Sequence, residues 1–163
     1  MTVTRYVVEL RNLNPTHTAE IKVTATADDI AATLGQAYAE VWQYLASQDI
    51  TSTGVAYARY QMRNGFFDIQ AGFSTPLAVK GEGRVRPGEL PGGEAAVCLH
   101  EGPYDQVGEA YTAVNEWLLR EGREVQGSPW EVYLTPPGVE PLRTEVFFPL
   151  RPKANTTARR IGI

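Results

Sequence analysis

The chain contains one cysteine, two histidines and no long uninterrupted apolar run. Cys98 alone cannot form a disulfide within the chain, and its place in an apolar run indicates packing rather than chemistry. No apolar stretch reaches the roughly 18 residues that a membrane-spanning helix needs, and no signal-peptide pattern precedes Tyr6. We therefore expect a cytoplasmic protein.

Basic residues are also in short supply, with 15 Lys and Arg against 19 Asp and Glu, so the net charge is −4. This balance argues against direct nucleic-acid binding. The basic stretch at 151–163 is expected to be a solvated tail. The apolar share of 43% over 163 residues is that of an ordinary globular chain with a single domain.

The motifs of several enzyme and cofactor classes are missing. Gly81-Glu82-Gly83 has neither the third glycine nor the Lys-Ser/Thr pair of a phosphate-binding loop. Ser128 does not lie in a G-x-S-x-G turn, which argues against a serine hydrolase. Cys98 and His100 share a strand face without a third or fourth ligand at a suitable spacing. We expect neither a metal nor a cofactor.

An internal repeat is present instead. A shift of 73 positions, from Gly35 to Gly108, superposes the apolar stripes of two helical segments and then Tyr60 on Tyr133 without a gap. A repeat of this length exceeds a solenoid unit and suggests one domain with internal pseudo-two-fold symmetry. The matched stripes are Ala37, Tyr38, Val41 and Leu45 in the first half and Ala110, Tyr111, Val114 and Leu118 in the second.

Hydrophobic periodicity and turn residues predict the elements of each half. Asp28 or Asp29 is expected to cap the first helix through its carboxylate, and Gly122 to end the second. In the first half we expect strands at 6–10 and 21–26 paired as a hairpin, a helix from about 30, and strands at 54–62 and 66–73. In the second half we expect a strand at 95–99, a helix at 104–121, and strands at 130–134 and 142–150.

The predicted fold is therefore α+β, with tandem strand–helix–strand–strand repeats, an antiparallel sheet and a ligand cleft between the halves. Repeat 1 covers about 6–77 and repeat 2 about 94–150, and residues 78–93 connect them.

One carboxylate lies among the aromatic residues of the last strand. Alternation puts Thr144, Val146 and Phe148 on the face that the helices cover, and Glu145 and Phe147 on the other. The repeat places Gly72 opposite Glu145, so only one half supplies an acid. A groove between the halves could collect Tyr57, Tyr60, Trp130, Tyr133 and Phe147 around Glu145.

Such a groove suits flat, apolar and often cationic molecules, because aromatic faces and a partly desolvated carboxylate both attract cations. The alternative is that Glu145 pairs with Arg143 or Arg59 on a solvated face while the aromatic residues only pack.

Several motifs together resemble the GyrI-like small-molecule-binding domains, also called AraC-type effector-binding domains. The resemblance runs from Val7 to Leu150. The motifs that carry it are Leu90-Pro91-Gly92-Gly93, His100-Glu101-Gly102-Pro103-Tyr104, Pro129-Trp130-Glu131-Val132-Tyr133-Leu134 and Arg143-Thr144-Glu145-Val146-Phe147-Phe148-Pro149-Leu150.

The resemblance implies a tandem strand–helix–strand–strand fold that binds hydrophobic, often cationic small molecules, as multidrug-type effector domains do. It matches the family's acidic pocket residue to Glu145 and its pocket aromatics to Trp130 and Tyr133, and Tyr104 completes the candidate ligand-binding set. Because the chain contains no helix-turn-helix, we expect a stand-alone member.

The family also includes hydrolases that open cyclopropane-bearing genotoxins, and a gyrase inhibitor. In the hydrolase alternative, Glu145 is the candidate base and Tyr133 the candidate hydroxyl donor. In the other alternative, the surface binds a protein partner such as gyrase.

Overall fold

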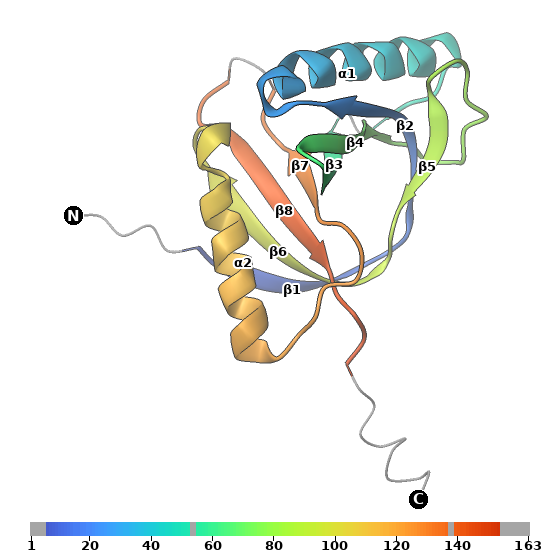
Figure 1. The fold of residues 1–163 in the computed structure, drawn as a ribbon. Coiled ribbons are helices and arrows are strands. Elements are labelled where there is room, and N and C mark those ends of the chain that lie inside the picture. Colours follow the sequence, from blue (N-terminus) through green and yellow to red (C-terminus); the bar gives the residue numbers. More distant parts are fainter. Residues whose placement is uncertain (1–5, 53–54, 137–138, 154–163) are drawn as a thin grey trace, which may run out of the picture.

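The computed structural model describes residues 6–52, 55–136 and 139–153, which form a curled eight-stranded antiparallel sheet and two α-helices (Figure 1). The strand order is β1-β6-β8-β7-β3-β4-β2-β5. The strands are β1 (Val8–Leu13), β2 (Thr16–Ala25), β3 (Ala56–Arg63), β4 (Phe66–Ser74), β5 (Arg86–Leu90), β6 (Gly93–Glu101), β7 (Trp130–Tyr133) and β8 (Arg143–Pro149). The helices are α1 (Ile30–Ser47) and α2 (Gly108–Glu121), preceded by the short 3-10 turns η1 (Ala27–Asp29) and η2 (Tyr104–Gln106).

The order of the strands confirms the predicted α+β fold of two strand–helix–strand–strand units. The unit β2-α1-β3-β4 and the unit β6-α2-β7-β8 meet where β3 pairs with β7. At the centre of that pairing Ala58 lies opposite Glu131, and these two residues are themselves 73 positions apart. The pseudo-two-fold axis therefore passes between them.

The predicted hairpin of the first two strands is wrong. Only Asn14 and Pro15 separate β1 from β2, yet β1 pairs with β6, and β2 pairs with β4 and β5. The strand that precedes each unit, β1 or β5, thus pairs with the other unit. The two connections, from β1 to β2 and from β5 to β6, lie against each other, because a Cβ atom on Gly92 would lie 2.5 Å from Cδ of Pro15. Strand β5 lies in the segment predicted as a plain connector.

The second unit also contains a two-residue insertion that the sequence shift of 73 does not show. Tyr57 pairs with Gly72 in the first unit, whereas its counterpart Trp130 pairs with Phe147 in the second. Phe147 is therefore the structural counterpart of Gly72, and Glu145 that of Gln70. The extra two residues lie in the connection from β7 to β8, which is longer than the tight Asn64-Gly65 turn of β3 and β4.

The helix ends match the sequence only in part. Gly122 ends α2 in the left-handed conformation, with φ at 63°, as predicted. The predicted carboxylate cap of α1 is wrong, because neither η1 nor α1 has a side-chain cap. Asp29 instead accepts a hydrogen bond from the Thr26 hydroxyl at 3.1 Å. Gly54, the predicted start of β3, and most of the basic tail lie outside the described residues.

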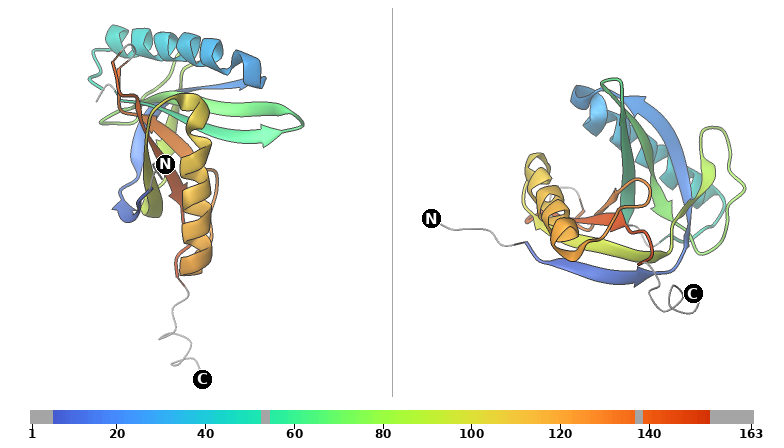
Figure 2. Two further views of the ribbon diagram at one scale, coloured as in Figure 1. Left: turned by 90° about the vertical axis from the view of Figure 1, so that its left-hand side faces the viewer. Right: turned by 60° about the horizontal axis from the view of Figure 1, so that its bottom comes forward.

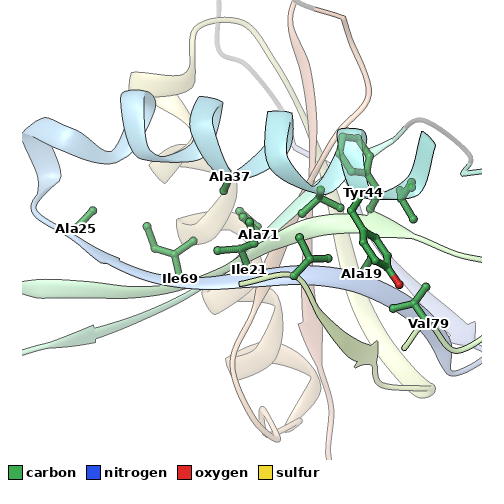
Figure 3. Close-up of a cluster of buried hydrophobic side chains, with 13 residues drawn as sticks. Ala19, Ile21, Ala25, Ala37, Tyr44, Ile69, Ala71 and Val79 are labelled. Carbon is green, nitrogen blue, oxygen red and sulfur yellow. The ribbon is translucent and has the colours of Figure 1, made fainter. Parts of the chain in front are cut away.

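Both helices cover the same face of the sheet, which we call the helix face. Under α1 the side chains of β2 and β4 form a buried cluster with Ala37 and Tyr44, which Figure 3 shows at close range. Under α2 the residues Ala96, Cys98, Val146 and Phe148 form a second cluster.

The opposite, helix-free face lines the inside of the curl. Leu13 of β1 and Leu90 of β5 come from the two edges of the sheet, yet both pack on the same cluster of Val97, Trp130 and Phe147. The two edges therefore approach one another, and the views in Figure 2 show this curvature. Every strand residue consequently faces either the helices or the inside of the curl.

Candidate functional site

A buried carboxylate lies on the helix face where the two units meet. Glu131, in the middle of β7, is 8% exposed. Alternation along β7 turns Glu131 and Tyr133 to the helices and Trp130 and Val132 to the inside of the curl. Cross-strand pairing agrees, because Glu131 lies opposite Ala58 and Val146, which belong to the two clusters under the helices.

Tyrosine hydroxyls hold both oxygens of this carboxylate. Tyr111 of α2 donates to Oε2 at 2.7 Å, and Tyr133 donates to Oε1 at 2.9 Å. The Tyr60 and Tyr133 oxygens are 2.6 Å apart. Since the Tyr133 proton is directed to Glu131, Tyr60 donates to Tyr133. Tyr60 and Tyr133 are repeat mates, so this bond crosses the pseudo-two-fold axis.

Burial governs the acidity of the whole group. It raises the pKa of the Glu131 carboxyl above its ordinary value, although the two tyrosine hydroxyls and the nearby His100 act in the opposite direction. Burial, and next the charge of Glu131, raises the pKa values of Tyr133, Tyr60 and Tyr111. The tyrosines therefore remain protonated donors at any physiological pH.

Further aromatic rings surround the carboxylate. Tyr104 of η2 is 45% exposed, and its ring meets that of Tyr133 edge-on at 5.6 Å between centroids. Tyr38 of α1 donates to the Tyr57 carbonyl oxygen at 2.8 Å, and Phe67 meets the Tyr60 ring edge-on. We call Glu131 and the tyrosines 38, 60, 104, 111 and 133 the tyrosine cluster.

His100 of β6 holds the loop before Tyr104 in place. Its Nε2 lies 2.9 Å from the Pro103 carbonyl oxygen, which can only accept, so Nε2 carries the hydrogen. In the neutral ring Nδ1 then accepts from the Tyr6 hydroxyl at 3.0 Å. The bond to Pro103 fixes the loop that leads directly into Tyr104.

The structure separates the residues that the sequence grouped around Glu145. Tyr60, Tyr104 and Tyr133 come together, but around Glu131 on the helix face. Glu145 faces the inside of the curl, where Oε2 accepts from Nη2 of Arg11 at 2.8 Å. Neither Arg143 nor Arg59, the partners considered from sequence, makes this ion pair.

Trp130, Phe147 and Tyr57 also lie on the helix-free face. The rings of Trp130 and Phe147 stack at 5.2 Å with an interplanar angle of 5°, and both are nearly buried. Tyr57 is 2% exposed and donates to Oε1 of Glu20 at 2.9 Å. These three rings are buried in the sheet and form core contacts.

Sequence reasoning missed Glu131, Tyr111 and Tyr38 as site residues. The signal was available for Glu131, because alternation gives it the face of Tyr133, which is the helix face. It was less visible for Tyr38 and Tyr111, because both belong to apolar helical stripes that are typical of core positions.

Metal binding and membrane spanning both lack support in the described parts of the chain. There, no group of three or more His, Cys, Asp or Glu side chains is arranged to hold a metal ion. Neither described helix combines the length and apolar character needed to cross a membrane.

With this geometry in view, comparison with known proteins identifies the family. The sequence matches the family described as GyrI-like small molecule binding domain over residues 7–151. The chain belongs to this family. No curated protein matches it.

Solved structures with the same fold include three informative neighbours. EcmrR in its complex with DNA has a TM-score of 0.77 at 19% identity, over 91% of this chain and 58% of the EcmrR chain. A separate structure of the EcmrR C-terminal domain has a TM-score of 0.75 at 18% identity, over 92% of this chain and 100% of that domain. This chain thus spans little more than half of the EcmrR chain in the DNA complex.

The other two neighbours are more distant. A hydrolase from Listeria innocua has a TM-score of 0.61 at 12% identity, over 88% of this chain and 91% of that one. SAV2435 bound to tetraphenylphosphonium has a TM-score of 0.55 at 15% identity, over 89% and 94%. Likeness at these identities establishes the fold.

Proposed function

We propose that the tyrosine cluster binds hydrophobic, cationic small molecules, with Glu131 as the countercharge. The observation that carries this proposal is the state of Glu131. It is buried among aromatic rings, and within the described residues no Lys or Arg pairs with it. A buried carboxylate held only by neutral hydroxyls is costly, and a bound cation would offset that cost.

The surrounding rings suit such a ligand. Aromatic faces attract cations, and tyrosines combine a large apolar surface with a fixed hydroxyl. The rings come from five elements, α1, β3, η2, β7 and α2. Small shifts of the helices would therefore let the cluster bind ligands of different shape. Binding of several unrelated cations is therefore part of the proposal. The lipophilic cation bound to SAV2435 has this chemistry.

A titration with tetraphenylphosphonium tests the proposal. Glu131→Gln keeps the shape and removes the charge, so affinity should fall by about 1–2 kcal/mol, or roughly 5- to 30-fold. Glu145→Gln removes one carboxylate from the other face and is the matched control, with little expected change. Triphenylphosphine oxide, a neutral analogue, should respond weakly to either change.

The comparison of the two variants decides between the two acids. Loss of affinity in Glu145→Gln with none in Glu131→Gln would move the site to the helix-free face. An equal loss for the cation and the neutral analogue would contradict the charge argument.

A second candidate function uses the same residues as catalysts. Opening an electrophilic cyclopropane by water requires a base. The base takes a proton from the water molecule while the water oxygen attacks a ring carbon. The ring C–C bond then breaks, and its electron pair takes up a proton. Burial raises the pKa of Glu131, which makes its carboxylate a stronger base than an exposed one, and the Tyr133 hydroxyl donates to it at 2.9 Å. The neighbour described as a hydrolase shares the fold.

Mass analysis separates the two functions. A cyclopropane-bearing compound incubated with the protein should gain the mass of water, and Glu131→Gln should abolish the gain. Binding with unchanged ligand mass leaves the protein as a binder. Inhibition of a partner such as gyrase stays a prediction for a supercoiling assay.

A further inference from the structure

A hollow lies on the opposite face of the sheet from the tyrosine cluster. It has a volume of about 480 Å³ and runs across β2, β4 and β3, where it is lined by Lys22, Gln70 and Arg59 among others. These three residues alternate with Ile21, Ile69 and Ala58, which belong to the buried cluster under α1. The hollow therefore opens on the helix-free face.

Strand register aligns the key side chains in one row. Gln70 lies opposite Lys22 on one side and opposite Arg59 on the other, and Arg59 in turn lies opposite Trp130. Neighbouring strands are about 4.8 Å apart, so Lys22 and Arg59 begin roughly 10 Å from each other. Two long basic side chains at that spacing can converge on one ligand between them.

Arg59 is held in place before any ligand arrives. Its Nε donates to the Ser128 carbonyl oxygen at 3.0 Å, and its guanidinium carbon lies 5.7 Å from the centroid of the Trp130 ring. The loop also packs closely, since a Cβ atom on Gly127 would lie 3.2 Å from Nη2 of Arg59. These contacts fix the plane of the guanidinium and leave N–H donors on its Nη atoms, the geometry that favours paired bonds to a carboxylate or phosphate.

The charges around the hollow are unbalanced. Three of its lining residues are cations, Lys22, Arg59 and Arg63, and one is an anion, Asp68. Arg63 and Asp68 neutralise each other at 3.0 Å, and Asp68 also accepts from Thr24. Within the described residues, neither Lys22 nor Arg59 has a carboxylate partner within ion-pair distance.

The buried acid Glu20 does not pair with Lys22 or Arg59. Glu20, on the same face of β2, is 4% exposed. Its Oε2 accepts from Gln70 at 3.0 Å, and its Oε1 accepts from Tyr57 at 2.9 Å. Both oxygens are therefore bound by neutral groups of the sheet, and Gln70 stands between Glu20 and the hollow.

We propose that this hollow binds a small organic oxyanion, a molecule with a carboxylate or phosphate group, through Arg59 and Lys22. The protein would then carry two sites of opposite preference on the two faces of one sheet, a cation site at Glu131 and an anion site at Arg59. The second site does not depend on the first, because it shares no charged residue with it.

Titration with citrate and, separately, with inorganic pyrophosphate tests this proposal and distinguishes a carboxylate from a phosphate ligand. The readout is the change in backbone amide NMR shifts near neutral pH. At least one probe should bind saturably with a dissociation constant at or below about 1 mM. The amides of the residues that line the hollow should shift first.

Matched variants locate the binding. Lys22→Gln and Arg59→Gln should each weaken it about tenfold, because each removes a charge-assisted hydrogen bond. Arg84→Gln is the control, since it makes the same change of net charge on an exposed residue paired with Glu40. Lys22 is exposed, so its substitution tests the site even where Arg59→Gln disturbs the Ser128 loop.

Two outcomes would overturn the proposal. One is the lack of saturable binding of both probes by the unaltered protein up to about 10 mM. The other is an equal loss in Arg84→Gln and Lys22→Gln, which would show a general attraction of anions to positive charge and no site.

Discussion

At the scale of the residue, Glu131 and Glu145 differ in how their negative charges are compensated. Both acids lie near aromatic rings, Glu131 on β7 and Glu145 on the adjacent strand β8. Glu145 is compensated, since Arg11 pairs with it and also lies over the Phe147 ring at 5.9 Å. Glu131 receives hydroxyl hydrogen bonds and no cation from the described residues. Under the proposed function, Glu131 is therefore the acid of this pair that would gain from a cationic ligand.

Cation affinity should therefore depend on pH through Glu131. Burial raises its pKa, so the carboxyl is partly protonated at a pH where an exposed one is fully ionised. The affinity for tetraphenylphosphonium should rise with pH through this raised pKa and then level off. Calorimetry in buffers of different ionisation enthalpy should also detect proton release on binding, because the bound cation lowers the pKa again. A Glu131→Gln variant with the same pH profile would contradict the assignment.

The same group has an effect of known sign on folding. A carboxyl with a folded-state pKa above its unfolded value takes up a proton more readily when folded, so its contribution favours the fold below the unfolded pKa. That contribution is lost as the pH rises through the folded pKa. Glu131→Gln should accordingly be more stable, relative to the unaltered protein, at pH values above this window than below it. Urea unfolding on both sides of the window measures the difference.

At the scale of the element, the sequence predicted the types of the elements better than their partners. Both helices, the Asn64-Gly65 turn and the strand pairs that follow each helix were predicted, because periodicity and turn residues are local signals. The exchange of β1 and β5 between the units was not, because pairing across the chain leaves no local pattern in Val8–Leu13 or Arg86–Leu90.

The candidate site shows the same limit of local signals. Alternation turned Glu145 away from the helices, which is where the structure has it. The roles that the resemblance suggests for Tyr133 and Tyr104 in ligand binding stay predictions. The error lay in bringing Tyr60 and Tyr133 to the face of Glu145, because the sequence gives no strand register. A two-residue difference between the β3–β4 and β7–β8 connections also misaligned Gly72 with Glu145.

Gly72 has a structural role that this register explains. A Cβ atom built on it would lie 2.0 Å from the Ala19 carbonyl oxygen, a backbone atom of β2 that cannot move without disturbing the sheet. Gly72→Ala should lower the free energy of unfolding by about 2–3 kcal/mol. Gly35→Ala in α1 is the control, because its Cβ meets nothing within 4 Å and alanine favours the helix by about 1 kcal/mol. Equal urea midpoints for the two variants would show that β2 yields easily.

At the scale of the whole molecule, the pseudo-two-fold axis brings tyrosines of two similar units around one acid. Ala58 and Glu131 face each other across the axis, so the duplication supplies paired tyrosines but a single acid. Each unit contributes a β-strand tyrosine, Tyr60 or Tyr133, and a helix tyrosine, Tyr38 or Tyr111. A ligand on the axis would contact both units at once, and one acid would hold one cation.

Hydrogen exchange with tetraphenylphosphonium bound should reveal this arrangement. We expect one cation per chain and slower amide exchange in α1, β3, β7 and α2 together, because the ligand would contact elements of both units at once. Glu131→Gln at the same cation concentration should lose the protection in both units in parallel, while Glu145→Gln should keep it. Protection confined to one unit, or two cations bound per chain, would mean that each half binds on its own. The axis would then have no part in recognition, even though the tyrosine hydroxyls meet across it.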